Sequence, residues 1–193
     1  MNNIEVLINR FNKHNPIIIN NSNLINSAII IPLIFVKNKL EIIFIKRSDK
    51  VKHHKNQIAF PGGKFDKDDK NLLKTALREI EEEIGITENN IKILGRLDDT
   101  TTFVTNYIIS PFIGLILNSG IQLKPNIDEI SEIIKIPIDE LLKKENFLTE
   151  EIEHNCRKYI IYKYIYKDHI IWGATSRILK QFLELYKKIN HRN

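Results

Sequence analysis

Cysteine is nearly absent from this chain of 193 residues, which contains Cys156 alone. A single cysteine cannot close an internal disulfide, so the fold does not need an oxidising compartment. The neighbours of Cys156 are Asn155 and Arg157, and no histidine or acid stands beside it to support a nucleophile. We therefore expect no catalytic cysteine.

Long hydrophobic runs are also missing. The longest, from Ala28 to Val36, is interrupted by Pro32 and is too short to cross a bilayer. The first residues lack the basic start and apolar stretch of a secretory signal. These features predict a cytoplasmic protein without a membrane partner.

Aromatic residues make up only 8% of the chain, against 42% hydrophobic residues in total, so the core must depend on isoleucine and leucine. The length suits one domain better than two. The net charge of +5 is compatible with an anionic ligand, but also with a solvated, lysine-rich surface.

Hydrophobic periodicity predicts strands and helices mixed without strict alternation. The expected strands are 27–36, 40–46, 58–60, 91–97, 108–117, 130–136, 157–166 and 170–172, and the expected helices are 3–13, 69–84, 138–144 and 174–188. This pattern favours an α+β fold, an α/β/α sandwich around a mixed sheet. Residues 1–25 would form a helix and linker, and residues 26–190 a single domain.

The helix expected at 69–84 carries the most chemical information. At about 100° per residue, Glu79, Glu82 and Glu83 share one face, and Leu77 and Ile80 lie on the other. Such a face is either a solvated acidic surface or a site for a hard divalent cation such as Mg²⁺ or Mn²⁺.

The residues before this helix favour the cation site. Pro61-Gly62-Gly63 permits a tight turn and a close approach to a ligand. Asp66, Asp68 and Asp69 can cap the helix and suit the positive end of its dipole. Arg78 can neutralise and orient one of the carboxylates.

The run from Arg78 to Ile86, Arg-Glu-Ile-Glu-Glu-Glu-Ile-Gly-Ile, resembles the second half of the Nudix box, and Gly63 matches its leading glycine. Asp69 stands where the general box has glutamate, and the spacing from Gly63 to Arg78 is one residue longer. Both departures occur in the coenzyme A pyrophosphatase branch of the family.

Other segments resemble that branch as well. They are Lys46-Arg47-Ser48, His54, residues 57–63, Leu97-Asp98-Asp99, residues 107–114 and residues 171–178. One departure is Asn56, which stands where the branch usually has glycine. The resemblance spans about residues 26 to 185.

The resemblance implies a Nudix fold with a loop–helix–loop, and hydrolysis of a pyrophosphate bond with Mg²⁺ or Mn²⁺. It implies Glu79 and Glu83 as the principal metal ligands, with Glu82 as a third and Arg78 among the catalytic residues. The general base stays open. The implied substrate is a small nucleotide like coenzyme A, and the implied products are 4′-phosphopantetheine and adenosine 3′,5′-bisphosphate.

Several residues are candidates for contacts to substrate. Arg47, Lys52 and Lys55 can bind phosphates, or they are ordinary surface cations. Gly62 and Gly63 would let the backbone approach the ligand. Trp172 and Tyr107 either stack on the base or, as we expect, pack in the core.

Two rival functions remain open from the sequence. The first is a Nudix hydrolase of NADH, a dinucleoside polyphosphate or a nucleoside triphosphate. The second is a non-catalytic module that binds nucleotide or RNA. The complete set of glutamates favours the enzyme, so no nucleic-acid partner is expected. Formation of a homodimer is left open.

Overall fold

The computed structural model describes residues 11, 13–51, 54–102, 105–154 and 157–190. The elements in chain order are β1 (Ile25–Val36), β2 (Lys39–Arg47), β3 (Ile58–Ala59), β4 (Gly62–Lys64), α2 (Leu72–Ile84), η1 (Glu88–Asn90), β5 (Ile91–Arg96), β6 (Thr100–Thr101), β7 (Tyr107–Ile116), β8 (Ile130–Pro137), α3 (Ile138–Leu141), η2 (Lys144–Asn146), β9 (Phe147–His154), β10 (Arg157–Tyr166), β11 (His169–Ile171) and α4 (Gly173–Asn190).

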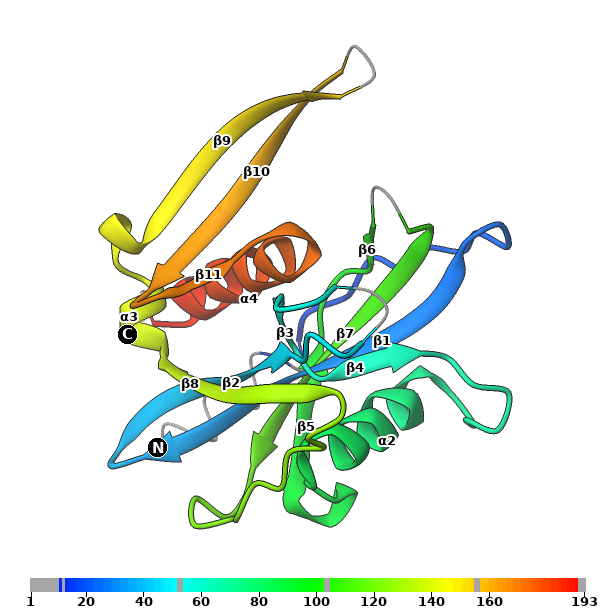
Figure 1. Cartoon of the computed structure of the whole chain (residues 1–193), viewed down its shortest axis with the longest axis vertical. Coiled ribbons are helices and arrows are strands. Elements are labelled where there is room, and N and C mark those ends of the chain that lie inside the picture. The colour runs from blue at the N-terminus through cyan, green and yellow to red at the C-terminus, as the bar shows by residue number, and fades with distance from the viewer. Residues whose placement is uncertain (1–10, 12, 52–53, 103–104, 155–156, 191–193) are drawn as a thin grey trace.

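The central sheet is mixed, as the sequence predicts. Its strands run in the order β3-β2-β1-β7-β5, with β4 on β1, β6 on β7 and β8 on β2. The pair β1 and β7 is parallel, whereas the other pairs in this sheet are antiparallel. Figure 1 shows this sheet between α2 on one side and α4 on the other.

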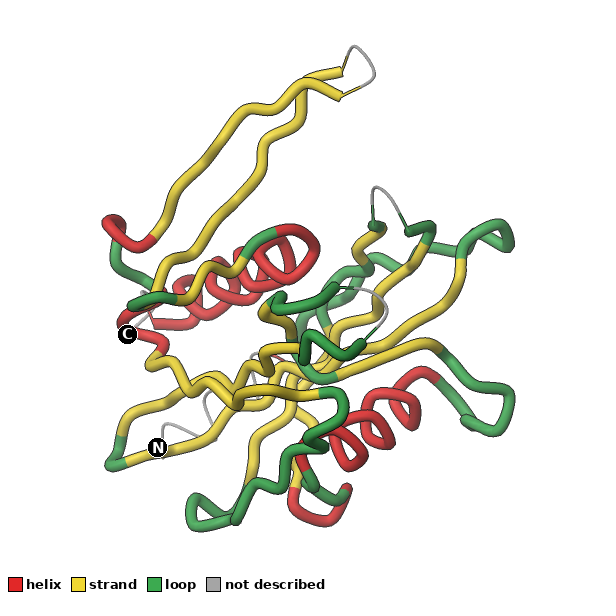
Figure 2. Tube along the Cα trace, in the orientation of Figure 1, coloured by secondary structure: helices red, strands yellow, loops and turns green. Residues whose placement is uncertain are grey.

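Strand β2 shows why two helices cover the sheet. Its buried residues alternate: Ile42 and Phe44 join the core cluster that includes α4, and Ile43 and Ile45 join the cluster that includes α2. Successive side chains of a strand point to opposite faces, so both faces need a cover. The predicted α/β/α sandwich is confirmed, and the tube in Figure 2 shows its two helical layers.

A second sheet, in the order β11-β10-β9, lies beside α4. The hairpin of β9 and β10 projects away from the central sheet (Figure 1). The sequence predicts β10 and β11 but misses β9, whose Glu150, Glu151 and Glu153 break the apolar alternation. It also misses the short strands β4 and β6.

The segment before β1 is fastened to the domain by two aspartates. Asp98 accepts a hydrogen bond from Ile17 N at 2.9 Å, and its carboxylate lies 2.9 Å from His14 Nε2. Asp99 accepts from Ile19 N at 2.9 Å. Asp98 and Asp99 therefore have a structural role.

Most of the helix expected at 3–13 lies outside the described residues. Phe11 is described: it is buried, and its ring stacks on Phe182 of α4 at 5.6 Å between centroids. No helix in the described part of the chain is long and apolar enough to cross a bilayer.

Candidate active site

Helix α2 places the acidic residues, and its ends are set locally. Asn71 is the N-cap, and its side chain accepts a hydrogen bond from Lys74 N at 3.0 Å. Gly85 ends the helix at φ +74°, the left-handed conformation that glycine adopts most easily. The prediction that Asp66, Asp68 or Asp69 caps α2 is wrong, because Asn71 stands closer to its first turn.

Glu79 and Glu83 both face strand β4. Glu83 is only 2% exposed, and its Oε2 accepts a hydrogen bond from Gly62 N at 3.0 Å. A Cβ at Gly63 would lie 2.4 Å from the carboxyl carbon of Glu79, so only glycine leaves this carboxylate its place. The positions of the two glutamate side chains therefore depend on the two glycines of β4.

Burial makes these two carboxylates costly to ionise. It raises the pKa of Glu83 to about 8, although Gly62 N–H and the Arg47 guanidinium favour the charged form. Burial also raises the pKa of Glu79, against the opposing effect of Arg78. Burial thus outweighs the positive charges of Arg47 and Arg78, and a bound divalent cation would favour the ionised forms of both carboxylates.

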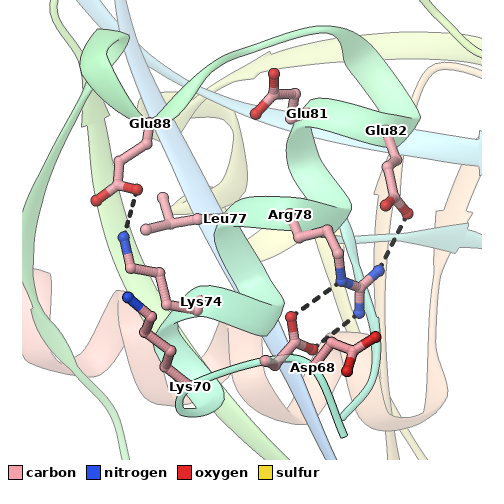
Figure 3. Close-up of a pocket in the computed structure, with 9 residues that line it drawn as sticks. Asp68, Lys70, Lys74, Leu77, Arg78, Glu81, Glu82 and Glu88 are labelled. Carbon is pink, nitrogen blue, oxygen red and sulfur yellow. Dashed lines mark hydrogen bonds and ion pairs between the residues drawn. The ribbon is translucent and has the colours of Figure 1, made fainter. Parts of the chain in front are cut away.

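Glu82 lies differently from the other two. It is 56% exposed, and its Oε2 lies 3.1 Å from Arg78 Nη1. Arg78 also contacts Glu79 Oε1 at 2.8 Å, and it holds both Asp69 oxygens at 3.1 Å. Figure 3 shows Arg78 bound to Glu82, with Glu81 pointing away from it. Arg78 therefore connects the site to the turn that precedes α2.

A cleft of about 540 Å³ adjoins the glycines of β4. Arg47 lines it, and its Nη1 lies 3.4 Å from Glu83 Oε1, a long contact. The predicted candidates Gly62 and Gly63 line it too, and so does His54. The other lining residues include Lys64, Ser27, Thr102, Thr105, Tyr107, Thr175, Ile25, Ile29, Ile58, Ile109 and Ile178.

Of the two lysines predicted to bind phosphate, the structure describes Lys55. Lys55 is exposed and is not among the residues that line the cleft, and Lys52 lies outside the described residues. Asn56, which replaces the usual glycine of the branch, has φ +58°. Asparagine tolerates this left-handed conformation better than most residues.

Carboxylate oxygens are donors that Mg²⁺ takes in proteins. In the described part of the chain, no three His, Cys, Asp or Glu side chains lie close enough to enclose an ion. Mg²⁺ commonly keeps several waters and takes one or two carboxylates together with substrate phosphates. Glu79 and Glu83 can supply these two carboxylates.

Sequence reasoning missed Glu129. Its carbonyl accepts a hydrogen bond from Ser48 N at 2.7 Å, and in the same turn Asn126 N donates to Glu83 O at 2.9 Å. The negative charge of Glu129 contributes to the raised pKa of both Glu79 and Glu83. No local motif marks this residue, because only the folded chain brings its turn to α2.

The two aromatic residues also differ from expectation. Trp172 is 45% exposed, so the prediction that it packs in the core is wrong. Tyr107 is half-buried and lines the cleft.

The mixed sheet between two helical layers, with paired glutamates against a glycine strand, defines the class of a Nudix hydrolase. The family described as the NUDIX domain matches residues 26–155. The chain therefore belongs to the Nudix family. Hydrolases of this family act on small nucleotide substrates and generally use divalent metals such as Mg²⁺ or Mn²⁺.

Two curated relatives are each called "Uncharacterized Nudix hydrolase NudL". The protein of Photorhabdus laumondii is 33% identical over 159 residues, which cover 82% of this chain and 83% of the relative. The protein of Pectobacterium atrosepticum is 32% identical over 155 residues, 80% of this chain and 79% of the relative. These similarities support the class and leave the substrate unspecified.

Two solved structures share the fold. A MutT/nudix family protein from Enterococcus faecalis has a TM-score of 0.56 at 19% identity, covering 88% of this chain and 64% of its own. An Ap4A hydrolase from C. elegans has a TM-score of 0.51 at 16% identity, covering 61% and 82%. At these identities the likeness concerns the fold alone.

Asp69→Asn should destabilise the metal-free protein. The hydrogen bond from Arg78 lowers the pKa of Asp69 from 3.8 to about 2. A lowered carboxyl pKa gives stability that is present above pH 3.8 and is lost as the pH falls through 2. We expect the free energy of unfolding to fall by about 1–2 kcal/mol at pH 7. This figure already allows for solvent screening, because Arg78 is about one-third exposed.

Urea unfolding in EDTA at pH 7 and at about pH 2.5 measures this effect, and Asp68→Asn, at an exposed neighbour, is the matched control. The difference in the free energy of unfolding between wild type and Asp69→Asn should be smaller at the lower pH. An equal gap at both pH values would contradict the assigned ion pair.

Proposed function

We propose that this chain hydrolyses the pyrophosphate bond of coenzyme A or its derivatives with Mg²⁺ or Mn²⁺. The products would be 4′-phosphopantetheine and adenosine 3′,5′-bisphosphate. The observation that carries the proposal is the buried carboxylate of Glu83 and the partly buried carboxylate of Glu79, which lie against Gly62 and Gly63 beside a cleft. A cytoplasmic location is part of the proposal.

Each residue has a task in this proposal. Glu79 and Glu83 would hold the cation, and Arg78 keeps Glu79 oriented through its 2.8 Å contact. Arg47 and Lys64 line the cleft and would bind the diphosphate oxygens. Glu82 is a peripheral ligand at most in this geometry. A bound divalent ion offsets phosphate charge and lowers the pKa of a coordinated water.

The walls of the cleft support coenzyme A as the substrate. Five isoleucines line it together with the hydroxyl side chains of Ser27, Thr102, Thr105 and Thr175. Apolar walls with a few placed polar groups suit a long aliphatic arm that contains amides and hydroxyls, such as pantetheine. The branch-like segments at 46–48, 57–63, 107–114 and 171–178 support the same substrate.

A substrate panel tests the proposal. The chain is incubated with Mg²⁺ or Mn²⁺ and coenzyme A, acetyl-coenzyme A, NADH, a dinucleoside tetraphosphate or a nucleoside triphosphate, and the products are separated and weighed. We expect kcat/KM for coenzyme A or its thioester to exceed that for NADH by at least about tenfold, or about 1.4 kcal/mol. Faster turnover of NADH would overturn the assigned substrate but not the Nudix chemistry.

A further inference from the structure

Two polar side chains on one face of helix α4 hold it against the central domain. Arg177 and Gln181 are four residues apart, so they lie on the same side of the helix. Arg177 Nη2 donates a hydrogen bond to the Thr101 carbonyl of β6 at 2.6 Å. Gln181 Oε1 accepts one from Asp98 N at 3.0 Å. Both contacts therefore reach one short segment, which leads from β5 into β6.

The segment that Arg177 contacts continues into one wall of the cleft. Thr102 follows Thr101 directly, and its N donates to the Tyr107 carbonyl at 2.9 Å. The hydroxyl of Thr102 accepts hydrogen bonds from Tyr107 N and from Thr105 Oγ1, both at 2.9 Å. Thr102, Thr105 and Tyr107 all line the cleft, and we call these three residues the far wall.

The far wall is distant from the end of the cleft that would receive the phosphates. Along β1, Gly62 pairs with Ile29 and Tyr107 pairs with Ile25. The four residues from Ile25 to Ile29 span about 13 Å in a strand. A substrate whose diphosphate lies at the glycines of β4 would therefore touch the far wall only with a part remote from the bond that is cut.

Arg177 connects two of the segments that line the cleft. Ala174 and Thr175 line it from the first turn of α4, and Arg177 follows them in the same helix. Its hydrogen bond ends on β6, which lies next to α4 in Figure 1. Burial lowers the pKa of Arg177, so this cation is costly to hold here, and the bond to the Thr101 carbonyl offsets part of that cost.

The hydroxyl of Thr102 indicates what kind of group the far wall can bind. A hydroxyl has one donor and two acceptor positions. The acceptor positions of Thr102 are taken by Tyr107 N and Thr105 Oγ1, so a ligand can pair with this hydroxyl only by accepting from it. A carbonyl, ether or hydroxyl oxygen meets this requirement, whereas an ammonium group does not.

We propose that Arg177 is a positioning residue for substrate binding. Through the Thr101 carbonyl it fixes the place of the Thr102 hydroxyl, which donates to an oxygen of the substrate remote from the diphosphate. The proposal rests on the cleft as the substrate site and on the pyrophosphate chemistry of the family. It does not rest on coenzyme A as the substrate.

Steady-state kinetics of Arg177→Gln test the proposal, with whichever substrate of the panel has the highest kcat/KM. We expect KM to rise at least about tenfold and kcat to stay within about twofold, because the lost contact binds the ground state and the transition state alike. Methylenediphosphonate, a competitive inhibitor that ends at its two phosphonates, should inhibit the variant and the wild type equally. An unchanged KM, a loss confined to kcat, or an equal weakening of this inhibitor would overturn the proposal.

Two further variants separate positioning of the far wall from general support of the fold. Arg177→Lys keeps a cationic donor and should recover part of the lost affinity. Gln181→Met removes the other contact of α4, which ends on Asp98 and not on the far wall. It should lower the melting temperature without changing KM. If Gln181→Met raised KM as much as Arg177→Gln, the effect would belong to the docking of α4 and the proposal would be wrong.

Thr102→Val tests the same contact from the other side, and it replaces Arg177→Gln if thermal melting in EDTA shows that this variant does not fold. Valine is close to threonine in shape but has no hydrogen-bonding group. KM should rise as in Arg177→Gln, and where both variants fold, the double variant should raise it no further, since both act on one contact. An unchanged KM in Thr102→Val would contradict the assigned role.

Discussion

Glu83→Gln is expected to lower kcat about a thousandfold, equivalent to about 4 kcal/mol of transition-state stabilisation. The amide keeps the shape of the side chain and can still accept the hydrogen bond from Gly62 N. It cannot supply the negative charge that draws a divalent ion into the site. Because a neutral group is cheaper to bury than a carboxylate, the metal-free variant should be at least as stable as wild type.

Two measurements separate a lost metal site from a damaged fold. Mn²⁺ should raise the melting temperature of the wild type but not that of Glu83→Gln, and phosphate-releasing activity should fall in parallel. Glu81→Gln is the matched control, because Glu81 is exposed on the same helix and points away from Arg78 (Figure 3). If Glu83→Gln kept full activity, the assigned metal site would be wrong.

Gly63→Ala should remove activity, by about a hundredfold or more, without unfolding the protein. The new Cβ would lie 2.4–2.6 Å from three carboxyl atoms of Glu79. These atoms are at the end of a flexible side chain, so Glu79 can move away at little cost to stability. A catalytic group displaced by about an ångström can lose about a hundredfold in rate.

The neighbouring glycine gives a contrasting control. At Gly62, φ is +153° and a Cβ would lie 2.4 Å from the backbone oxygen of Ala28 in β1. Backbone cannot move aside as a side chain can, so Gly62→Ala should lower the melting temperature strongly. Gly120→Ala, where a Cβ meets only Asn118 Oδ1 at 3.4 Å, should change neither property. Equal activity of Gly63→Ala and wild type would show that Glu79 does not need its present position.

Helical periodicity predicted much of this site because α2 is a local structure. The rotation per residue correctly grouped Glu79 and Glu83 on the face away from Leu77 and Ile80, which are buried. It also placed Glu82 near them, on the other side of Glu79. Strand β4 lies against Glu79 and Glu83 but not against Glu82, which is left exposed beside Arg78.

The parts that sequence could not predict depend on distant segments. Two backbone hydrogen bonds bring the turn of Glu129 to the site. Ser48 N donates to the Glu129 carbonyl, and Asn126 N donates to the Glu83 carbonyl. The local sequence predicts that Asp69 caps the helix. In the structure, Arg78, nine residues later, donates hydrogen bonds to both oxygens of Asp69. Strand β9 has no clear apolar alternation, and its pairing with β10 determines its conformation.

The position of α4 has a consequence for the limits of the catalytic unit. The region shared with the family, residues 26–155, stops before β10, β11 and α4. Yet Ile178 and Phe182 cover Ile42 and Phe44 in one cluster, and Ala174, Thr175 and Ile178 form a wall of the cleft. A shortened chain limited to the shared region would therefore have bare isoleucines on one side of its sheet and a cleft open along one edge.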